Sequence, residues 1–277
     1  MKYLKMTFEY VFVKEKGKHF LTFLLLAIMP ALALSYIFPA SQYITIFANY
    51  NTPYYANFGR LWLPIFSHPI WALLVFIFGL ILLVIAISSI NSIMMRHFRV
   101  NDFSLTRIFN STDENFFSSL TISIALIILI LFFHTFTCLF VVLWFSLKNS
   151  ILGIILAILS VLCVLLITIY LCSAITLWLP IMTLNGIPIF RALQLSFSKA
   201  HSCQNKMFIT NLFIALFCLI PTFLAWLFRD IWIIKLIFNS LVYITFITTL
   251  FPANLITYCD VEGITREDLI HSPYKRR

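Results

Sequence analysis

Charged residues are scarce in this chain of 277 residues: they make up 10% of it, and only ten residues are Asp or Glu. An average soluble domain is roughly 25% charged. Hydrophobic residues account for 62% of the chain, and no polar segment is long enough to build a core of its own. The composition therefore excludes a soluble domain and predicts an all-α polytopic membrane protein, with residues 1–277 forming a single integral membrane domain.

Motifs of catalysis are missing as well. The sequence has no HExxH zinc motif, no Gly-rich phosphate loop, no GxSxG elbow and no paired Asp residues for metal-assisted phosphoryl chemistry. Its six cysteines are scattered without metal-ligand spacing, and its six glycines give little support for the broken-helix ion sites of transporters. We therefore expect no catalytic residue, no metal site and no cofactor, so that the protein is not an enzyme.

Long apolar runs dominate what is present. A helix needs about 20 apolar residues to cross a bilayer. Runs of this kind predict six transmembrane helices near residues 20–38, 70–90, 120–145, 151–179, 207–227 and 231–258. The loops after the third and fifth runs are very short, so these spans should pack with the spans that follow them as antiparallel hairpins.

The basic residues are distributed unevenly between the loops. With the N-terminus inside, fifteen Lys and Arg lie on the inner side, and only four, Arg60, Lys148, Arg229 and Lys235, lie outside. The positive-inside rule then predicts an N-in/C-in topology. The same topology explains the net charge of +9, because the basic loops face the anionic lipids of the inner leaflet. The charge therefore gives no reason to expect that the protein binds nucleic acid. We expect a multi-pass protein of the bacterial cell (inner) membrane.

Amphipathic stretches on the inner side predict interfacial helices near residues 3–16, 102–113 and 188–202. In the first of these, Leu4, Phe8, Val11 and Phe12 form the expected apolar stripe. The third is the clearest. Asn185 and Gly186 end the preceding run, Pro188 suits a first helical turn, and Ile189, Leu193, Phe197 and Ala200 recur at helical spacing. The basic N-terminal head followed by Ala31-Leu32-Ala33 also fits a signal peptide, but the apolar run continues past that point and favours a first span.

The candidate contact residues follow from this layout. Three basic side chains of the interfacial helices are expected to contact the headgroups of anionic lipid or a protein partner. These are Arg191, Lys199 and Arg107. Aromatic residues of the long outer segment, among them Trp62 and Tyr54, predict either an aromatic belt at the outer interface or a lip that binds lipid or peptide.

A lone histidine, His134, lies within the third span. A proton relay needs a second titratable group, and the spans offer hydroxyls and amides instead. We expect His134 to be structural, with its imidazole bonded to a neighbouring hydroxyl or backbone group.

The segment ALQLSFSK (Ala192 to Lys199), followed by Asn205-Lys206-Met207-Phe208 and a new span, resembles the ALxxSW-then-basic segment of a known membrane domain. This is the six-span membrane domain of some bacterial glycerophosphoryl diester phosphodiesterases and of stand-alone uncharacterised relatives. The resemblance implies six spans. Phe197 stands where that family has tryptophan, and the soluble barrel that carries the phosphodiesterase active site is missing. The resemblance therefore carries over no catalytic residue.

Three hypotheses for function remain. The first is a noncatalytic membrane protein that handles lipid or acts as a scaffold for a membrane partner. The second is the permease subunit of an ABC-type exporter, in which residues 188–202 would contact the ATPase subunit. The third, a small enzyme acting on lipids, is disfavoured because paired acid and base residues are absent.

Overall fold

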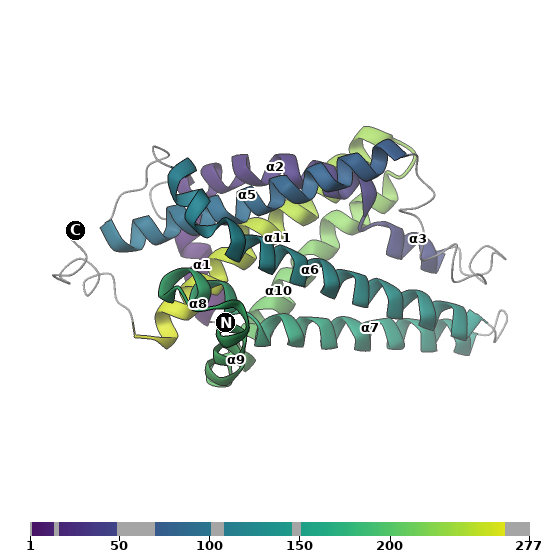
Figure 1. Ribbon diagram of the computed structural model, residues 1–277. Coiled ribbons are helices and arrows are strands. Elements are labelled where there is room, and N and C mark those ends of the chain that lie inside the picture. Colours follow the sequence, from purple (N-terminus) through teal and green to yellow (C-terminus); the bar gives the residue numbers. More distant parts are fainter. Residues whose placement is uncertain (1, 14–16, 49–69, 101–107, 146–150, 264–277) are drawn as a thin grey trace.

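The computed structural model describes residues 2–13, 17–48, 70–100, 108–145 and 151–263, and every regular element in these ranges is a helix. Six helical stretches are long and apolar enough to cross a membrane. They run side by side along a common direction (Figure 1). The predictions of an all-helical chain and of six potential spans are therefore confirmed.

Most ends of the six spans lie near the predicted residues; the exceptions are the two ends at the loop between α5 and α6 and the end of α7. They are α2 (Lys18–Ile37), α5 (Ile70–Val100), α6 (Ile108–Phe145), α7 (Ile151–Ala174), α10 (Gln204–Leu227) and α11 (Trp232–Val261). Helix α5 continues from residue 90 to residue 100, and α6 begins at residue 108 rather than near 120. Residues 102–107 of the predicted middle interfacial helix lie outside the described residues, and residues 108–113 form the start of α6.

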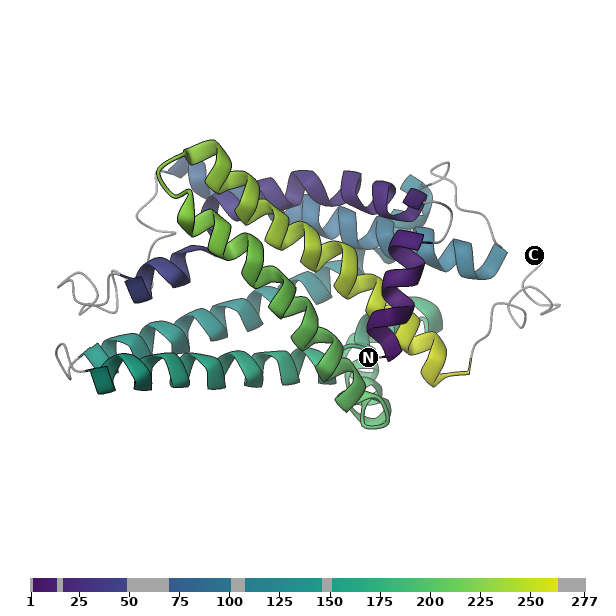
Figure 2. The same ribbon diagram turned by 180° about the vertical axis from the view of Figure 1, so that it is seen from behind.

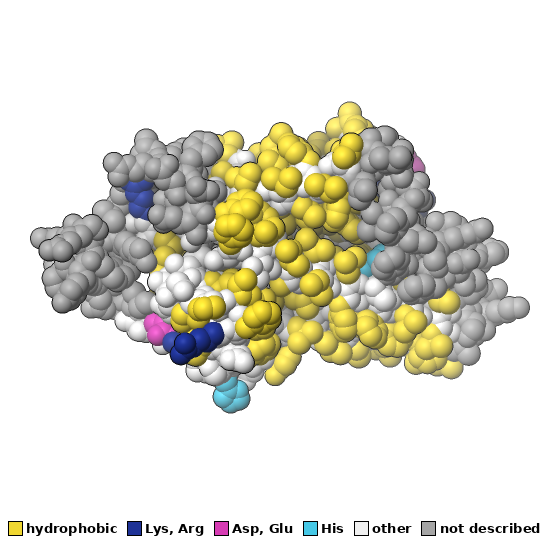
Figure 3. Space-filling view, in the orientation of Figure 1, with side chains coloured by type: hydrophobic (Ala, Val, Ile, Leu, Met, Phe, Trp, Pro, Cys, Tyr) yellow, Lys and Arg dark blue, Asp and Glu magenta, His cyan; other side chains and the backbone are white. Residues whose placement is uncertain are grey.

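Apolar side chains cover the lateral surface of the bundle. Each span is helical because, within hydrocarbon, backbone N–H and C=O groups must be satisfied inside the same segment. Large side chains on the outside of the spans are exposed instead of buried, as Leu74, Ile128, Leu162 and Phe217 illustrate. Figure 3 shows the resulting apolar band across the middle of the molecule. Such a band is far larger than the exposed apolar patches of soluble proteins.

The spans form a closed ring in chain order. Each packs against the next one along the sequence, and α11 closes the ring by packing on α2 while also contacting α5. The pairs α6/α7 and α10/α11 are the two antiparallel hairpins that the short loops predict (Figure 2). Helix α11 is the most central, and eight consecutive residues, Phe251 to Tyr258, are buried on all sides.

Three short helices gather at one end of the bundle, together with the C-terminal end of α11 (Figure 1). They are α1 (Lys2–Phe8), α8 (Trp178–Asn185) and α9 (Ile189–Ala200), and we call this the charged end. The opposite end carries α3 (Gln42–Ala48) and the turn between α10 and α11. There, Asn239 of α11 accepts a hydrogen bond from the Ser41 backbone, and Tyr243 donates to the Phe38 carbonyl.

The fourth predicted span, residues 151–179, ends earlier than expected. Helix α7 stops at Ala174, residues 175–177 form a turn, and the apolar residues that follow belong to the separate helix α8. Pro180 explains the break, since its ring lacks an N–H and would clash with the carbonyl of Thr176 in a continuous helix. In α8 the proline lies in the first turn, where it is tolerated.

The N-terminal helix differs from the prediction in the side that it buries. Helix α1 is followed by a π-helical turn, Glu9–Val13, and residues 14–16 lie outside the described ranges. The buried side chains are Tyr3, Thr7, Tyr10 and Val11, whereas the predicted apolar stripe was Leu4, Phe8, Val11 and Phe12. Phe8 is 56% exposed. The helix buries polar aromatic residues because α1 packs on α11 and α10, and the π-helical turn packs on α2, so the segment does not stand alone.

Candidate functional site

Helix α9 has three different faces. Ala192, Ser196 and Ala200 are buried, and their spacing of four residues places them on one side of the helix. Large apolar side chains form the second face, where Phe190 is 80% exposed and Ile189 and Phe197 are also exposed. The third face carries the polar residues Arg191, Gln194 and Ser198, all exposed. The sequence predicts two faces; the structure adds a third because small residues permit close packing.

The small-residue face attaches α9 to the end of the bundle. Helix α9 packs against α8 and α7 and lies at a steep angle to the spans (Figure 1). Trp178 Nε1 donates to the Ile189 carbonyl at 3.0 Å, and Ser196 Oγ donates to the Ala174 carbonyl at 3.2 Å. Gly186, with a φ of 62°, makes the reversal between α8 and α9. This left-handed conformation is one that a side chain would disfavour.

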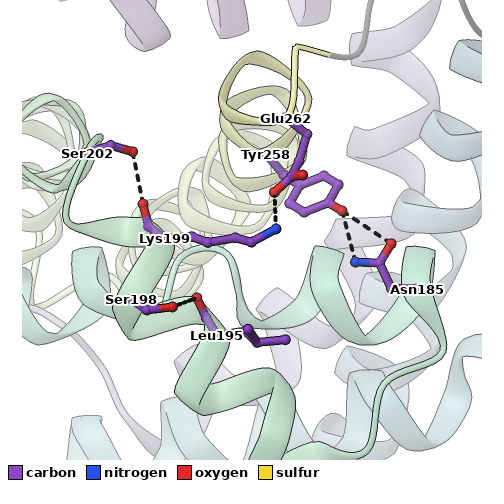
Figure 4. Close-up of polar contacts among 7 residues, drawn as sticks. All are labelled: Asn185, Leu195, Ser198, Lys199, Ser202, Tyr258 and Glu262. Atoms are coloured by element: carbon purple, nitrogen blue, oxygen red, sulfur yellow. Dashed lines mark hydrogen bonds and ion pairs between the residues drawn. The ribbon is translucent and has the colours of Figure 1, made fainter.

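Lys199 connects α9 to the C-terminal end of α11. Its Nζ lies 2.5 Å from a carboxylate oxygen of Glu262, just beyond α11 (Figure 4). Close by, Asn185 Nδ2 donates to Tyr258 Oη at 3.1 Å. Ser198 and Ser202 donate to backbone carbonyls at Leu195 and Lys199, so their hydroxyls are engaged locally. The positive charge of Lys199 is therefore neutralised within the protein.

A second polar cluster attaches α1 to α11. Lys2 Nζ lies 2.6 Å from Asp260 Oδ1, and Tyr3 Oη donates to Asp260 Oδ2 at 3.0 Å. Burial, together with this hydrogen bond, raises the pKa of the Tyr3 hydroxyl well above its ordinary value. The hydroxyl therefore stays protonated and continues to donate at every physiological pH.

The structure separates the predicted contact residues. Arg191 is exposed on α9, and no hydrogen bond or ion pair engages it within the part of the chain that the structure describes. Lys199, in contrast, is paired with Glu262. Arg107, Trp62 and Tyr54 lie outside the described residues. Of the predicted residues that the structure describes, Arg191 is thus the one that presents a positive charge beside the exposed apolar face.

A buried aromatic cluster at the charged end was not predicted. Tyr10 Oη lies 2.9 Å from His97 Nδ1, and His19 Nδ1 lies 2.8 Å from the Tyr10 carbonyl oxygen. The rings of His19 and His97 meet edge to face, with centroids 4.9 Å apart. The cluster joins the N-terminal segment to α2 and α5. His97 is far from Tyr10 and His19 in the sequence, and the three residues share no periodicity, so no sequence pattern points to the cluster.

His134 of α6 has the environment that the sequence predicts. It is 5% exposed, and its Nδ1 lies 3.1 Å from the hydroxyl oxygen of Tyr43 on α3. Cys138 Sγ lies 3.7 Å from Nε2, one turn further along α6. The hydroxyl partner agrees with a structural role, in which the imidazole holds α3 against α6.

No three His, Cys, Asp or Glu side chains of the described residues lie close enough together to hold a metal ion. The charged end presents an exposed apolar face on α9 beside the exposed Arg191. The acidic residues Asp260 and Glu262 are paired with Lys2 and Lys199. Comparison with protein-family models, with curated proteins and with solved structures found no match to this chain.

Proposed function

We propose that this chain is a noncatalytic multi-pass protein of a bacterial cell membrane, with both ends on the cytoplasmic side, and that it binds anionic lipid of the inner leaflet through α9. In this role it handles lipid or positions a membrane partner. The observation that carries the proposal is the exposure of Phe190 beside an exposed, unneutralised Arg191.

Helix α9 has the residue distribution of a helix that is stable at a membrane interface. An amphipathic helix with large apolar side chains on one face lies in the plane of the membrane interface, with that face sunk among the acyl chains. Helix α9 is held at a steep angle to the spans by its small-residue face, so its apolar face is free for lipid (Figure 1). The long side chain of Arg191 then reaches the phosphate level from the adjacent face.

The test is the amount of anionic lipid that the protein retains. The protein would be reconstituted in vesicles of phosphatidylcholine and phosphatidylglycerol, purified again, and its bound lipid measured by mass spectrometry. Arg191→Gln is expected to lower the apparent affinity for phosphatidylglycerol about fivefold, equivalent to ~1 kcal/mol for one basic residue near an anionic surface. Lys199→Gln is expected to change it less, because Glu262 already neutralises that lysine.

A matched control is Arg229→Gln, which removes the same charge from the opposite end of the bundle, where Arg229 is exposed. Phosphatidylglycerol retention equal to the wild type in Arg191→Gln, or an equal loss in Arg229→Gln, would contradict the proposal.

The permease subunit of an ABC-type exporter is the second candidate. The observation that favours it is that α9 is a short exposed helix joining two spans at the charged end, which is where a coupling helix would meet an ATPase subunit. A gene for such an ATPase beside the gene for this chain would favour the permease. ATP hydrolysis by that subunit would then depend on the polar face of α9 and not on Phe190.

A further inference from the structure

The buried apolar side chains of the described residues form two separate clusters. The larger cluster draws on the short helices of the charged end and on every span except α7. The smaller cluster belongs to α6 and α7 alone, and its members are Cys138, Val141 and Ala157, with Val142, Trp144 and Ile154 packed against them. The halves of α6 and α7 toward the opposite end, residues 134–145 and 151–160, therefore have a core of their own. We call these two segments the α6/α7 arm.

Helix α10 shows where the arm leaves the other spans. Toward the charged end α10 is joined to α7, because Asn211 Nδ2 donates to Ser173 Oγ at 2.9 Å. Toward the opposite end the large side chains on a broad face of α10 are exposed, and they are Leu216, Phe217, Leu219, Ile220 and Phe223. Both views show α7 and α10 diverging toward that end, with α3 between the arm and the other spans (Figures 1 and 2).

Helix α3 bridges this separation. Tyr43 Oη lies 3.1 Å from His134 Nδ1 on the arm, and the Tyr43 ring packs on Phe133 with centroids 5.3 Å apart. On the other side, Asn239 Oδ1 of α11 accepts from the Ser41 N–H at 3.0 Å, and α3 packs on α10. A movement of the arm away from α10 must therefore break the contact between Tyr43 and His134 or pull α3 away from α11.

The arm is built to move as one body. Trp144 Nε1 on α6 donates to Ser160 Oγ on α7 at 3.0 Å. Gly153 and Ala157 are buried and four residues apart, a small-residue spacing that lets two membrane helices pack closely. At the charged end, α6 packs on α8, and a turn at residues 175–177 separates α7 from α8. Rigid elements that pivot about the ends of helices are a common form of hinge motion in proteins.

We propose that the α6/α7 arm has a second position, further from α10 at the opposite end, and that the contact between Tyr43 and His134 is the latch that holds the first position. In the second position this hydrogen bond is broken, whereas the bond between Asn211 and Ser173 persists. Hydrocarbon offers no water to replace the broken bond, so the latched position predominates. The surfaces that part are apolar on both α7 and α10, and acyl chains of the bilayer fill the space between them.

The experiment measures the distance between the arm and α11 by pulsed electron paramagnetic resonance, with the full chain in nanodiscs. Spin labels are attached at Ile151→Cys, the first residue of α7, and at Ile233→Cys, in the first turn of α11, and both positions are exposed. The native cysteines are replaced, with Cys138→Ser chosen so that a polar group remains beside His134 Nε2. Two distances are expected, with the longer one in the minority.

The latch is tested by Tyr43→Phe, which removes the hydroxyl and keeps an aromatic ring against Phe133. The ratio of the long to the short distance is expected to rise about three- to fivefold, which is the effect of one hydrogen bond between membrane helices. His134→Leu should raise the ratio as well, whereas His134→Gln keeps a partner for Tyr43 and should leave it unchanged.

A matched control is Ser240→Ala, which removes a hydrogen bond between α2 and α11, away from the arm, and should not change the ratio. Tyr43→Phe combined with His134→Leu removes both polar groups. In this double variant the arm should stay released although thermal stability is partly recovered, so it decides the question if a single variant does not fold. A distance distribution in the folded latch variants equal to that of the parent, or an equal rise in Ser240→Ala, would overturn the proposal.

The inference does not depend on the role of α9. Arg191→Gln is expected to leave the distance distribution unchanged, and Tyr43→Phe is expected to leave phosphatidylglycerol retention unchanged. The failure of either proposal is therefore distinguishable from the failure of the other.

Discussion

At the scale of single residues, some polar groups within the spans bond to one another across helices. Ser35 and Ser240 hydroxyl oxygens are 2.8 Å apart, joining α2 to α11, and Asn211 donates to Ser173, joining α10 to α7. Hydrocarbon offers no water to replace these partners, so a residue that loses its partner keeps the full desolvation cost. A substitution that removes one partner of such a pair should therefore cost more stability than a double substitution that removes both partners.

His134 provides the first prediction. His134→Gln keeps a donor and an acceptor near Tyr43 and is expected to leave the melting temperature of the purified protein nearly unchanged. His134→Leu leaves the Tyr43 hydroxyl without this partner and should destabilise the protein by about 1–3 kcal/mol. Adding Tyr43→Phe to His134→Leu should recover part of the loss, because both polar groups are then removed. If the Gln variant were as unstable as the Leu variant, or abolished a pH-dependent activity, the structural role would be wrong.

At the scale of elements, α2 and α5 approach closely at a glycine. A Cβ atom on Gly79 would lie 2.8 Å from the Cβ of Ala33, a separation that forces one of the helices to move. Small residues at such crossings are a common device of membrane helices, which gain van der Waals contact when their backbones come close.

The second prediction follows from that contact. Gly79→Ala should destabilise the protein by about 1–3 kcal/mol through overpacking, measured as a lower melting temperature in detergent. In a background that already carries Ala33→Gly, the same substitution should cost little, because the opposing Cβ is gone. Equal destabilisation in both backgrounds would show that the helices do not meet at this point.

The docking of α1 on α11 leads to a third prediction, which compares an ion pair with a buried ring. Asp260→Asn removes the pairing with Lys2, whose side chain is half exposed, and should cost less than about 1 kcal/mol. Tyr3→Ala empties a position that is 2% exposed and should cost about 3 kcal/mol. Thermal unfolding measures both. A larger loss in Asp260→Asn than in Tyr3→Ala would mean that charge, and not burial, holds the helix.

Hydrophobicity predicts the spans well and their irregularities poorly. Runs of apolar residues locate all six spans, because length and composition alone decide whether a segment can cross hydrocarbon. They miss the end of α7, since Ile175 to Leu179 are as apolar as the helix before them and only Pro180 signals the break. They miss the buried face of α1, because that face is set by packing on α10 and α11 and not by hydrophobicity. The cluster of Tyr10, His19 and His97 depends on three elements meeting and has no pattern in the sequence.

At the scale of the whole molecule, the charges divide between the two ends of the apolar band. Among the described residues, the charged end carries the side chains of Lys2, Lys5, Lys18, Arg96, Arg191, Lys199 and Lys206, and the opposite end carries those of Arg229 and Lys235. A bundle with an even number of spans brings both chain ends to one side, and the contact of Lys2 with Asp260 agrees with this. The asymmetry is what the positive-inside rule requires of a cytoplasmic face.

The last prediction tests this orientation. In a variant without native cysteines, a cysteine replacing Ser198 on α9 should react with a membrane-impermeant maleimide only after the cells are permeabilised. A cysteine replacing Asp230, in the turn between α10 and α11, should react in intact cells, because that turn lies at the opposite end. Both positions are exposed, so accessibility within the protein does not limit either reaction. Labelling of the α9 cysteine in intact cells would place the basic residues outside. In that case Arg191 could not bind lipid of the inner leaflet, and the proposed function would be wrong.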